Sequence, residues 1–245
     1  MIPPFADEMN KSRRMYSELA RQLSARGVNA MLFDFYGTGD SEGLMEDASW
    51  QDWSIDIQTC VSAIYDIGIE TICLMGVRTG ALLATTFLNE NNVDTHKLLL
   101  WQPVIDGSVF INQFLRLKLA SSMMNGDLNK ETTKDLKAQL QRGDSLEIAG
   151  YTLNPDLVAA IASSTLKGFM PGSNIEIAWI DIVADLERSS PVANTKLVEQ
   201  WQQAGVKVRH EKVVGMPFWN SVEIVENREL IDMSRRFLSC ETMRR

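Results

Sequence analysis

Thr71-Ile-Cys-Leu-Met-Gly-Val-Arg-Thr-Gly80 is the segment that indicates the fold most directly. Its first five residues are mostly apolar and predict a buried strand over 71–75. An alanine-rich segment comes next and predicts a helix over 78–89. Gly76 and Gly80 flank Arg78 at the step between the two elements, and glycine allows the tight turn and close packing that such a step requires. The stretch therefore predicts a strand, a sharp turn and a helix.

The same alternation of strand and helix extends to both sides of this stretch. Apolar runs rich in β-branched residues predict further strands over 30–35, 97–101, 176–183 and 206–214. Helical patterns alternate with them over 11–26, 49–66, 191–204 and from about 227 onward. Ser49 with Asp52, and Ser190, are the expected helix caps. Strands alternating with helices are typical of a parallel sheet with helices on both faces.

The alternation of strands and helices is interrupted over residues 106–172. An apolar helix is expected over 110–124 and a polar helix over 131–142. A third helix is expected to be capped by Asn154-Pro155, with proline at its first position. We find no repeat, low-complexity tract or linker. The sequence therefore predicts one domain over 1–245, with a helical insert over about 106–172 that acts as a lid.

A second glycine-rich segment directly follows the strand expected over 30–35. It reads Asp34-Phe-Tyr-Gly-Thr-Gly-Asp-Ser-Glu-Gly43. Alone it is also compatible with a plain glycine-rich turn. The pattern D-x-x-G-x-G-x-S-x-G is, however, similar to the segment after the fourth strand of α/β-hydrolases. Gly76-Val-Arg-Thr-Gly80 is similar to their nucleophile elbow, G-x-S-x-G. The two segments in this order favour an α/β-hydrolase-like fold.

The residues of a catalytic triad do not accompany this fold. Arg78 stands at the nucleophile position, and a guanidinium is always protonated and has no lone pair with which to attack an acyl group. The family's base follows the last strand, where residues 214–220 contain no histidine. The chain has only His96 and His210, which we interpret as structural. Since an acid without base or nucleophile is no triad, we do not expect ordinary serine esterase chemistry.

Four further segments carry a narrower resemblance. They are residues 3–15 (PPFADEMNKSRRM), 100–104 (LWQPV), 113–116 (QFLR) and 217–219 (PFW). With them, nearly the whole chain resembles the exosortase A system-associated hydrolase 2 family. The resemblance implies a bacterial gene set linked to exopolysaccharide production and to the sorting of proteins with a C-terminal PEP signal. It also implies that an arginine at the elbow is a family feature. The word hydrolase in the family name rests on fold, which does not by itself imply activity.

One departure from that family concerns the start of the chain. Members carry strands before the Pro3-Pro4-Phe5 loop, which would contribute an oxyanion-hole amide, whereas this chain starts almost on the loop. We interpret this either as a shortened gene product or as a misassigned start. A gap or exposed edge is then expected between residues 30–35 and 71–75, and such an edge favours poor solubility or a homodimer.

Two functions remain open. The first is a hydrolase or transferase with an unorthodox base, and the second is a non-catalytic binding or accessory protein that keeps the pocket. The candidate bases are Asp40, Glu8 and Asp181. The candidate ligand contacts are Arg78, Thr79, Phe5, Trp219 and Gln102. At Arg78 the alternatives are an internal salt bridge, with Glu8, Asp40 or Asp181 as partner, and a ligand's carboxylate, phosphate or uronate.

The composition restricts the classes of partner that the chain is expected to bind. The formal net charge is -8 and the sequence pI is about 4.9, which argues against nucleic acid and anionic membrane surfaces. No apolar run approaches the roughly 20 residues of a membrane helix, and no secretory signal is present. Cys60, Cys73 and Cys240 lack metal-like spacing. We expect a cytoplasmic protein without metal or cofactor, whose partner is a small-molecule, glycan or acyl ligand.

Overall fold

The structure is a computed structural model that describes residues 1–124, 131–172 and 174–239. Cys240 lies outside these residues. The chain divides into two compact units. The first, called the sheet unit here, comprises Met1–Phe33, Thr59–Ile105 and Leu166–Arg245. The second, called the insert unit, comprises Asp34–Gln58 and Asp106–Thr165.

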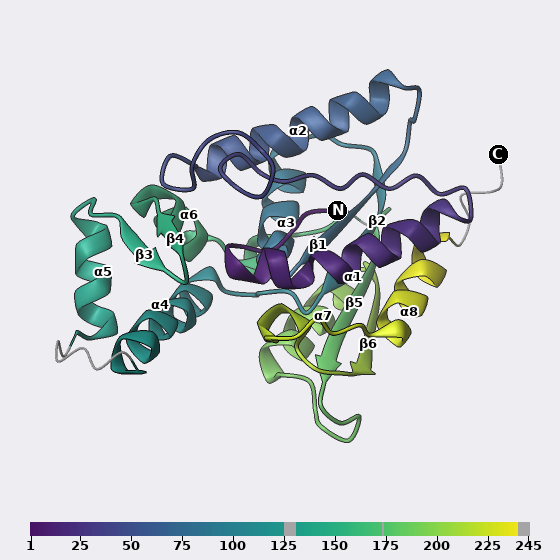
Figure 1. Ribbon diagram of the computed structural model, residues 1–245. Helices are drawn as coiled ribbons and strands as arrows, with labels where there is room; N and C mark the ends of the chain where they lie inside the picture. Colours follow the sequence, from purple (N-terminus) through teal and green to yellow (C-terminus); the bar gives the residue numbers. More distant parts are fainter. Residues whose placement is uncertain (125–130, 173, 240–245) are drawn as a thin grey trace. The chain divides into compact units, whose positions relative to one another are not determined.

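The sheet unit holds the expected alternation of strands and helices (Figure 1). Its strands are β1 (Ile72–Val77), β2 (Thr95–Trp101), β5 (Glu176–Val183) and β6 (Lys207–Val214). Its helices are α1 (Asp7–Ser24), α3 (Gly80–Glu90), α7 (Val192–Gln203) and α8 (Arg228–Ser239), with the short turns η1 (Leu166–Gly168) and η2 (Phe218–Asn220). Helix α2 (Trp50–Asp66) begins in the insert unit and ends in the sheet unit.

The four strands form one parallel sheet in the order β1-β2-β5-β6. Four of the five expected strands are therefore confirmed. The register pairs Val77 with Trp101 and Trp101 with Ile180, so the ends of β1 and β2 lie level with the last part of β5. In a parallel sheet the carboxyl ends of all strands share one edge, and this brings the elbow and the residues after β2 together.

The prediction of a strand over 30–35 is wrong, because those residues form no strand. A parallel strand needs a neighbouring backbone on which to form its hydrogen-bond ladder. Beside β1, the described residues offer only the chain's first two: Ile2 bridges to Gly76, and the Met1 amino group donates to the carbonyl of Met31 at 2.9 Å. Residues 30–35 have the apolar composition of a strand, but composition alone supplies no partner.

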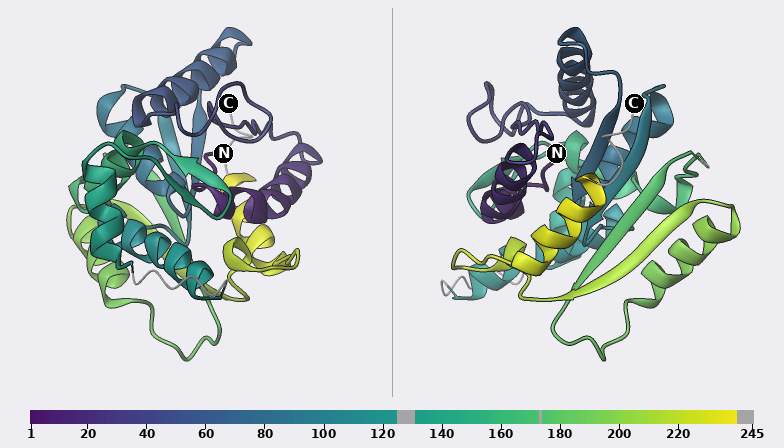
Figure 2. Two further views of the ribbon diagram at one scale, coloured as in Figure 1. Left: turned by 60° about the vertical axis from the view of Figure 1, so that its left-hand side comes forward. Right: turned by 90° about the vertical axis from the view of Figure 1, so that its right-hand side faces the viewer.

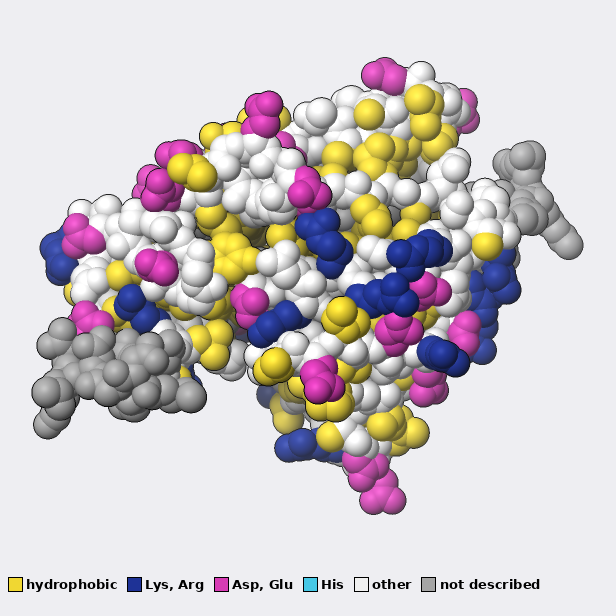
Figure 3. Space-filling model, viewed as in Figure 1, with side chains coloured by type: hydrophobic (Ala, Val, Ile, Leu, Met, Phe, Trp, Pro, Cys, Tyr) yellow, Lys and Arg dark blue, Asp and Glu magenta, His cyan; other side chains and the backbone are white. Residues whose placement is uncertain are grey.

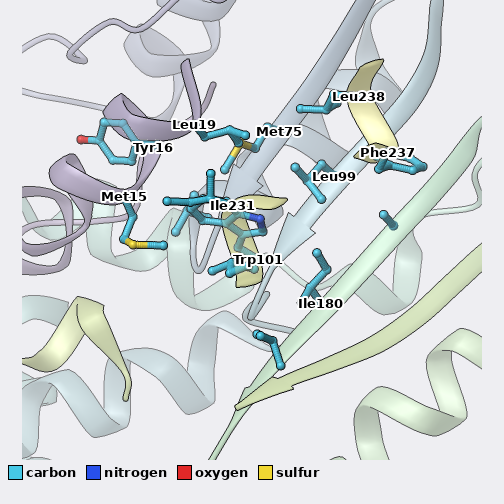
Figure 4. Close-up of a cluster of buried hydrophobic side chains, with 14 of the residues drawn as sticks. Met15, Tyr16, Leu19, Met75, Leu99, Trp101, Ile180, Ile231, Phe237 and Leu238 are labelled. Carbon is cyan, nitrogen blue, oxygen red and sulfur yellow. The ribbon is translucent and has the colours of Figure 1, made fainter. Parts of the chain in front are cut away.

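Helices cover both faces of the sheet. Alternate residues of a strand point to opposite faces, so Ile180 packs in the buried cluster that α1 and α8 build on one face (Figure 4). Trp179, the preceding residue, packs on Trp201 of α7, with ring centroids 5.8 Å apart. Figure 2 shows α8 and α7 on opposite sides of the sheet. The residues of the first cluster shown as labelled side chains are Met15, Tyr16, Leu19, Met75, Leu99, Trp101, Ile180, Ile231, Phe237 and Leu238.

The insert unit contains the three expected helices, α4 (Gly107–Met124), α5 (Thr133–Gln141) and α6 (Pro155–Ser163). Asn154 caps α6 as predicted, since its side chain accepts a hydrogen bond from the amide of Asp156. An antiparallel hairpin, β3 (Leu146–Ile148) with β4 (Tyr151–Leu153), was not predicted. Its turn residues Ala149 and Gly150 both have positive φ, 52° and 82°. That is a primed two-residue turn, for which the alternating pattern around Ala-Gly was the available signal.

The two other predicted helix caps have different outcomes. Ser49 and Asp52 form the expected capping box at the start of α2, with each residue bonding the other's backbone N–H. Ser190 does not cap α7, whose N-cap is Pro191. The Ser190 hydroxyl bonds the Asp181 carboxylate instead. In the part of the chain that the structure describes, no helix is long and apolar enough to cross a membrane.

Candidate functional site

The elbow has the geometry of a sharp strand-to-helix turn. Arg78 lies between β1 and α3 with a φ of 53°, which is left-handed and costs a non-glycine residue about 1–2 kcal/mol. Two backbone bonds hold it there: the Arg78 N–H donates to Trp101 at 3.0 Å, and the Arg78 carbonyl accepts from Val104 at 3.1 Å. Strain of this kind persists where the surroundings fix it, and it is concentrated at functional sites.

The two glycines of the elbow are required by close backbone approach. A Cβ atom at Gly76 would lie 2.6 Å from the Cα of Ala81. A Cβ at Gly80 would lie 2.6 Å from the carbonyl oxygen of Pro3. Both distances are shorter than any side chain tolerates. The glycines therefore allow α3 to begin against the strand and against the N-terminal loop.

Arg78 is paired with Glu8, a residue of α1. Its Nη2 lies 3.1 Å from Oε1 of Glu8, and its Nε lies 3.2 Å from Oε2. The two side chains are 15% and 16% exposed. Of the three internal carboxylates considered for Arg78, the structure places Glu8 against the guanidinium. Two nitrogens on one carboxylate form the bidentate arrangement in which arginine binds carboxylates most strongly.

Two further contacts complete the surroundings of the guanidinium. Nη1 of Arg78 donates to the carbonyl oxygen of Gln102 at 3.3 Å. The guanidinium carbon lies 4.8 Å from the ring centroid of Trp219, a cation–π distance. Trp219 belongs to η2, where the neighbouring Phe218 is buried edge-on against Trp101. The loop after β6 thus brings an indole to the place where the fold family has its histidine.

The electrostatics of Glu8 are set by opposing effects. Burial raises the pKa of the Glu8 carboxyl above its ordinary value, and the charge and hydrogen bonds of Arg78 only partly offset this rise. Asp7 raises the pKa further, while Lys11 lowers it. Asp7 and Lys11 themselves form a salt bridge at 2.6 Å. Glu8 therefore takes up a proton more readily than an exposed glutamate does.

Thr79, Phe5 and Gln102 support the elbow. The Thr79 hydroxyl oxygen accepts a hydrogen bond from the Phe5 amide at 2.8 Å, which ties the N-terminal loop to the elbow. Gln102 has a φ of 41°, and its side-chain oxygen accepts from the amide of Ile182 at 2.6 Å. The side-chain oxygens of Thr79 and Gln102 are thus both engaged within the protein. The structure brings Phe5, Glu8, Arg78, Thr79, Gln102 and Trp219 together.

Asp181 lies in a different cluster. It is fully buried and accepts hydrogen bonds from Trp179 at 2.9 Å, from Asn194 at 2.9 Å and from Nε2 of His210 at 2.8 Å. Burial alone raises the pKa of the carboxyl, but the bonds from His210, Ser190 and Trp179 outweigh it and lower the pKa. This network joins β5, β6 and α7, and sequence reasoning missed it. The alternation of Trp179 and Asp181 along β5 was the signal that could have revealed it.

Asp40 lies in the insert unit, in the glycine-rich loop after residue 33. Its amide donates to Oδ2 of Asp34 at 3.0 Å, and the hydroxyl of Ser41 donates to the Asp34 carbonyl at 2.6 Å. Gly37 has a φ of 74°, and a Cβ there would lie 2.7 Å from the carbonyl carbon of Leu44. These contacts build a tight turn, as predicted. They assign no chemistry to the Asp40 carboxylate.

The basic residues at the start of α1 belong to a surface of mixed charge. Figure 3 shows Lys and Arg side chains interspersed with Asp and Glu over α1 and α8. Arg14 pairs with Glu226 at 2.5 Å, and Arg21 pairs with Glu18 at 3.0 Å. Exposed pairs of this kind contribute little energy and belong to a solvated face. Among the described residues, no group of three or more His, Cys, Asp or Glu side chains could hold a metal ion.

The arrangement at the elbow permits two kinds of chemistry. A guanidinium at the N-terminus of α3 can hold a carboxylate or phosphate, because both the side chain and the helix end favour negative charge. A carboxyl group whose pKa is raised can act as a general base toward a bound water. Neither requires a serine nucleophile.

Comparisons with known proteins agree on the fold. The sequence model of the family described as "Serine aminopeptidase, S33" matches residues 6–193. Est1E from Butyrivibrio proteoclasticus, solved with ferulic acid bound, has 16% identity and a TM-score of 0.60, over 91% of this chain and 80% of that one. Mouse alpha/beta hydrolase domain-containing protein 10 has 12% identity and a TM-score of 0.56, over 97% and 86%.

A third solved structure is similar to the same extent. The monoacylglycerol lipase of Paleococcus ferrophilus has 13% identity and a TM-score of 0.54, over 93% of this chain and 89% of that one. At such low identities these likenesses show the α/β-hydrolase fold alone. No curated protein sequence is significantly similar to the chain.

Proposed function

We propose that the chain, which belongs to the serine aminopeptidase S33 family of α/β-hydrolases, binds a ligand bearing a carboxylate or phosphate at Arg78. We further propose that it forms no serine acyl-enzyme. The observation that carries this proposal is the bidentate contact between Arg78 and Glu8 at the nucleophile position. An arginine there cannot accept an acyl group, but its planar fork of donors suits a carboxylate or phosphate.

Glu8 occupies the place that such a ligand would take. The ligand's anionic group would replace the Glu8 carboxylate on Nε and Nη2, while Nη1 keeps its bond to Gln102. Protonation of Glu8 would ease this exchange, since a neutral carboxyl is a weaker partner for a guanidinium. As burial raises the pKa of Glu8, anion affinity should increase as the pH falls through that pKa.

The biological setting of the proposal rests on sequence resemblance. Residues 3–15 and 217–219 are among the segments similar to the exosortase A system-associated hydrolase 2 family. We accordingly place the protein in the bacterial cytoplasm, in a system linked to exopolysaccharide production. A glycan bearing a uronate, or an acyl ligand with a free carboxylate, has the group that Arg78 would recognise.

The test compares a charged sugar with its neutral counterpart. Glucuronate and glucose are titrated against the full chain by calorimetry, together with inorganic phosphate. We expect glucuronate to bind and glucose not to bind. Arg78→Met should weaken binding at least tenfold, and Glu8→Gln should strengthen it. If neither glucuronate nor phosphate binds, or if Arg78→Met binds them as well as the natural chain, anion binding at the elbow is excluded.

A second candidate function is hydrolysis with Glu8 as general base. The observation in its favour is the position of the Glu8 carboxyl, which lies against Arg78 at the turn before α3, where helix N–H groups would stabilise an oxyanion. Burial raises the pKa of this carboxyl, as a general base requires. Under this alternative, Glu8→Gln abolishes turnover of short acyl and glycosyl esters. Under pure binding no turnover exists to abolish, and Glu8→Gln binds glucuronate more tightly. The one variant therefore separates the two functions.

A further inference from the structure

Ser12, in the first half of α1, carries a buried hydroxyl group without a partner. Its exposed fraction is 0%, and among the residues that the structure describes its Oγ has no hydrogen-bond partner. By contrast, the buried Ser234 hydroxyl of α8 donates to the Leu230 carbonyl, one helical turn earlier, at 2.7 Å. A buried hydroxyl that has lost its bonds to water and gained none in the protein is costly. The Ser12 hydroxyl therefore calls for a partner that it meets in another state of the protein.

Ser12 lies one helical turn after Glu8 on the same face of α1. Residues four apart on a helix are neighbours, with Cβ atoms about 5–6 Å apart. Helical side chains lean toward the N-terminus of their helix, so Ser12 covers the turn that contains Glu8. Of the α1 residues three or four positions from Ser12 whose side chains carry oxygen, Tyr16 already donates to the Met9 carbonyl at 3.4 Å. The carboxyl of Glu8 is then the partner within reach.

The face of α1 that carries Glu8 and Ser12 is turned into the sheet unit. Met15, further along this face, points into the buried apolar cluster (Figure 4). Helix α1 also packs against η2, whose Trp219 lies on the Arg78 guanidinium. Ser12 thus follows the ion pair and precedes the apolar cluster along one helix face.

We propose that Ser12 receives the Glu8 carboxyl group when an anionic ligand displaces it from Arg78, so that Glu8 has two alternative partners in the fold. This inference rests on the proposed anion binding at Arg78. A carboxyl group that leaves a guanidinium inside the protein needs another polar partner, or the exchange is costly. A hydroxyl group both donates and accepts, so Ser12 can bond the protonated or the ionised form of Glu8. Ser12 is then a positioning residue, which acts on the ligand's affinity through Glu8.

The proposal predicts opposite effects of Ser12→Ala on the free and on the bound protein. In the free protein the hydroxyl is unpaired, so its removal should raise the melting temperature by about 2–4 °C. In the bound protein the hydroxyl holds Glu8, so its removal should weaken anion binding about three- to tenfold. A serine with a merely structural role would lose stability instead.

The experiment is a cycle of variants of the full chain. Glucuronate and inorganic phosphate are titrated by calorimetry against the natural chain, Ser12→Ala, Glu8→Ala and the double variant, and each protein is melted without ligand. We expect Ser12→Ala to weaken binding in the natural chain and to leave it unchanged in Glu8→Ala, where no carboxyl needs a partner. Ser17→Ala is the matched control, because Ser17 lies on the face of α1 opposite Glu8, and it should change neither property.

The outcomes separate this inference from the proposed function. If the natural chain binds neither glucuronate nor phosphate, the proposed function fails and the inference falls with it. If the natural chain binds one of them and Ser12→Ala binds it equally well, only the inference is overturned. An equal loss of affinity with and without Glu8 also overturns it, since Ser12 would then touch the ligand. So does a lower melting temperature of Ser12→Ala, which alone decides the matter if Glu8→Ala does not fold.

Discussion

Glu8 and Arg78 are 70 positions apart in the sequence, and Nη2 of the arginine lies 3.1 Å from Oε1 of the glutamate. The pair joins α1 to the strained turn between β1 and α3 and leaves each side chain about one-sixth exposed, at 16% and 15%. Its position at the place of a nucleophile makes its energetics the first property to measure.

Arg78→Ala should destabilise the protein at pH 7. Removing the guanidinium leaves the largely buried Glu8 carboxylate without its partner. This costs about 3 kcal/mol and lowers the melting temperature by roughly 6–12 °C. The double variant Arg78→Ala with Glu8→Ala should recover part of this loss. Urea unfolding of the four proteins measures the coupling. A double variant whose loss equals the sum of the two single losses would show that the pair has no energetic link.

The pH dependence of stability should carry the signature of Glu8. Because the pKa of Glu8 is raised by folding, the folded state binds its proton more tightly than the unfolded state. The resulting stabilisation is complete below the ordinary pKa of about 4.5 and is lost as the pH rises through the higher folded value. The free energy of unfolding, relative to Glu8→Gln, should therefore fall by at most about 1.4 kcal/mol per pH unit in that window. Parallel curves for the two proteins would contradict the shift.

Asp181 should show the opposite pH dependence. Its lowered pKa means that the ionised form stabilises the fold above the ordinary pKa of 3.8 and that this contribution is lost as the pH falls through the lower folded value. Asp181→Ala should cost about 3–5 kcal/mol at pH 7, since several buried donors lose their acceptor. The exposed Asp185 on the following loop is the matched control, and Asp185→Ala should cost less than about 1 kcal/mol. Equal losses for the two variants would contradict the network.

Gly80→Ala should destabilise the fold although alanine is the better helix former. The added Cβ would meet the carbonyl oxygen of Pro3 at 2.6 Å, and relief of that contact requires the N-terminal loop to move. Overpacking of this kind costs about 1–3 kcal/mol. Gly168→Ala is the control, because no atom lies within 4 Å of a Cβ at that position. A Gly80→Ala variant as stable as this control would show that the loop adapts freely.

Arg78→Ser should fail to create an esterase. The serine would stand at the nucleophile position, but the loop after β6 brings Trp219 rather than a histidine to the elbow, and an unactivated serine is a weak nucleophile. Turnover of p-nitrophenyl acetate should stay at the background rate, and a fluorophosphonate probe should label neither the variant nor the natural chain. Stoichiometric labelling of either protein would reveal an activating base not yet identified.

The local features of the protein could be predicted from its amino-acid sequence. The glycines around Arg78, the capping box of Ser49 with Asp52, and the apolar run of 176–183 each act over a few residues, so their patterns predicted the elbow, the start of α2 and the strand β5. The absence of histidine from 214–220 is likewise a property of the sequence. From these features followed the α/β-hydrolase fold and the expectation that serine chemistry is missing.

Features that depend on a partner distant in the sequence became visible only in the folded chain. Residues 30–35 have the composition of a strand but form none, because a ladder requires a neighbouring backbone that no local pattern supplies. Glu8, Asp40 and Asp181 were equivalent candidates for Arg78 in the sequence. The packing of α1 brings Glu8 to the guanidinium, while the alternation along β5 turns Asp181 toward α7 and His210. The packing of helices and the side of the sheet to which a strand residue points fix which carboxylate meets which cation. Both arise only when the chain has folded.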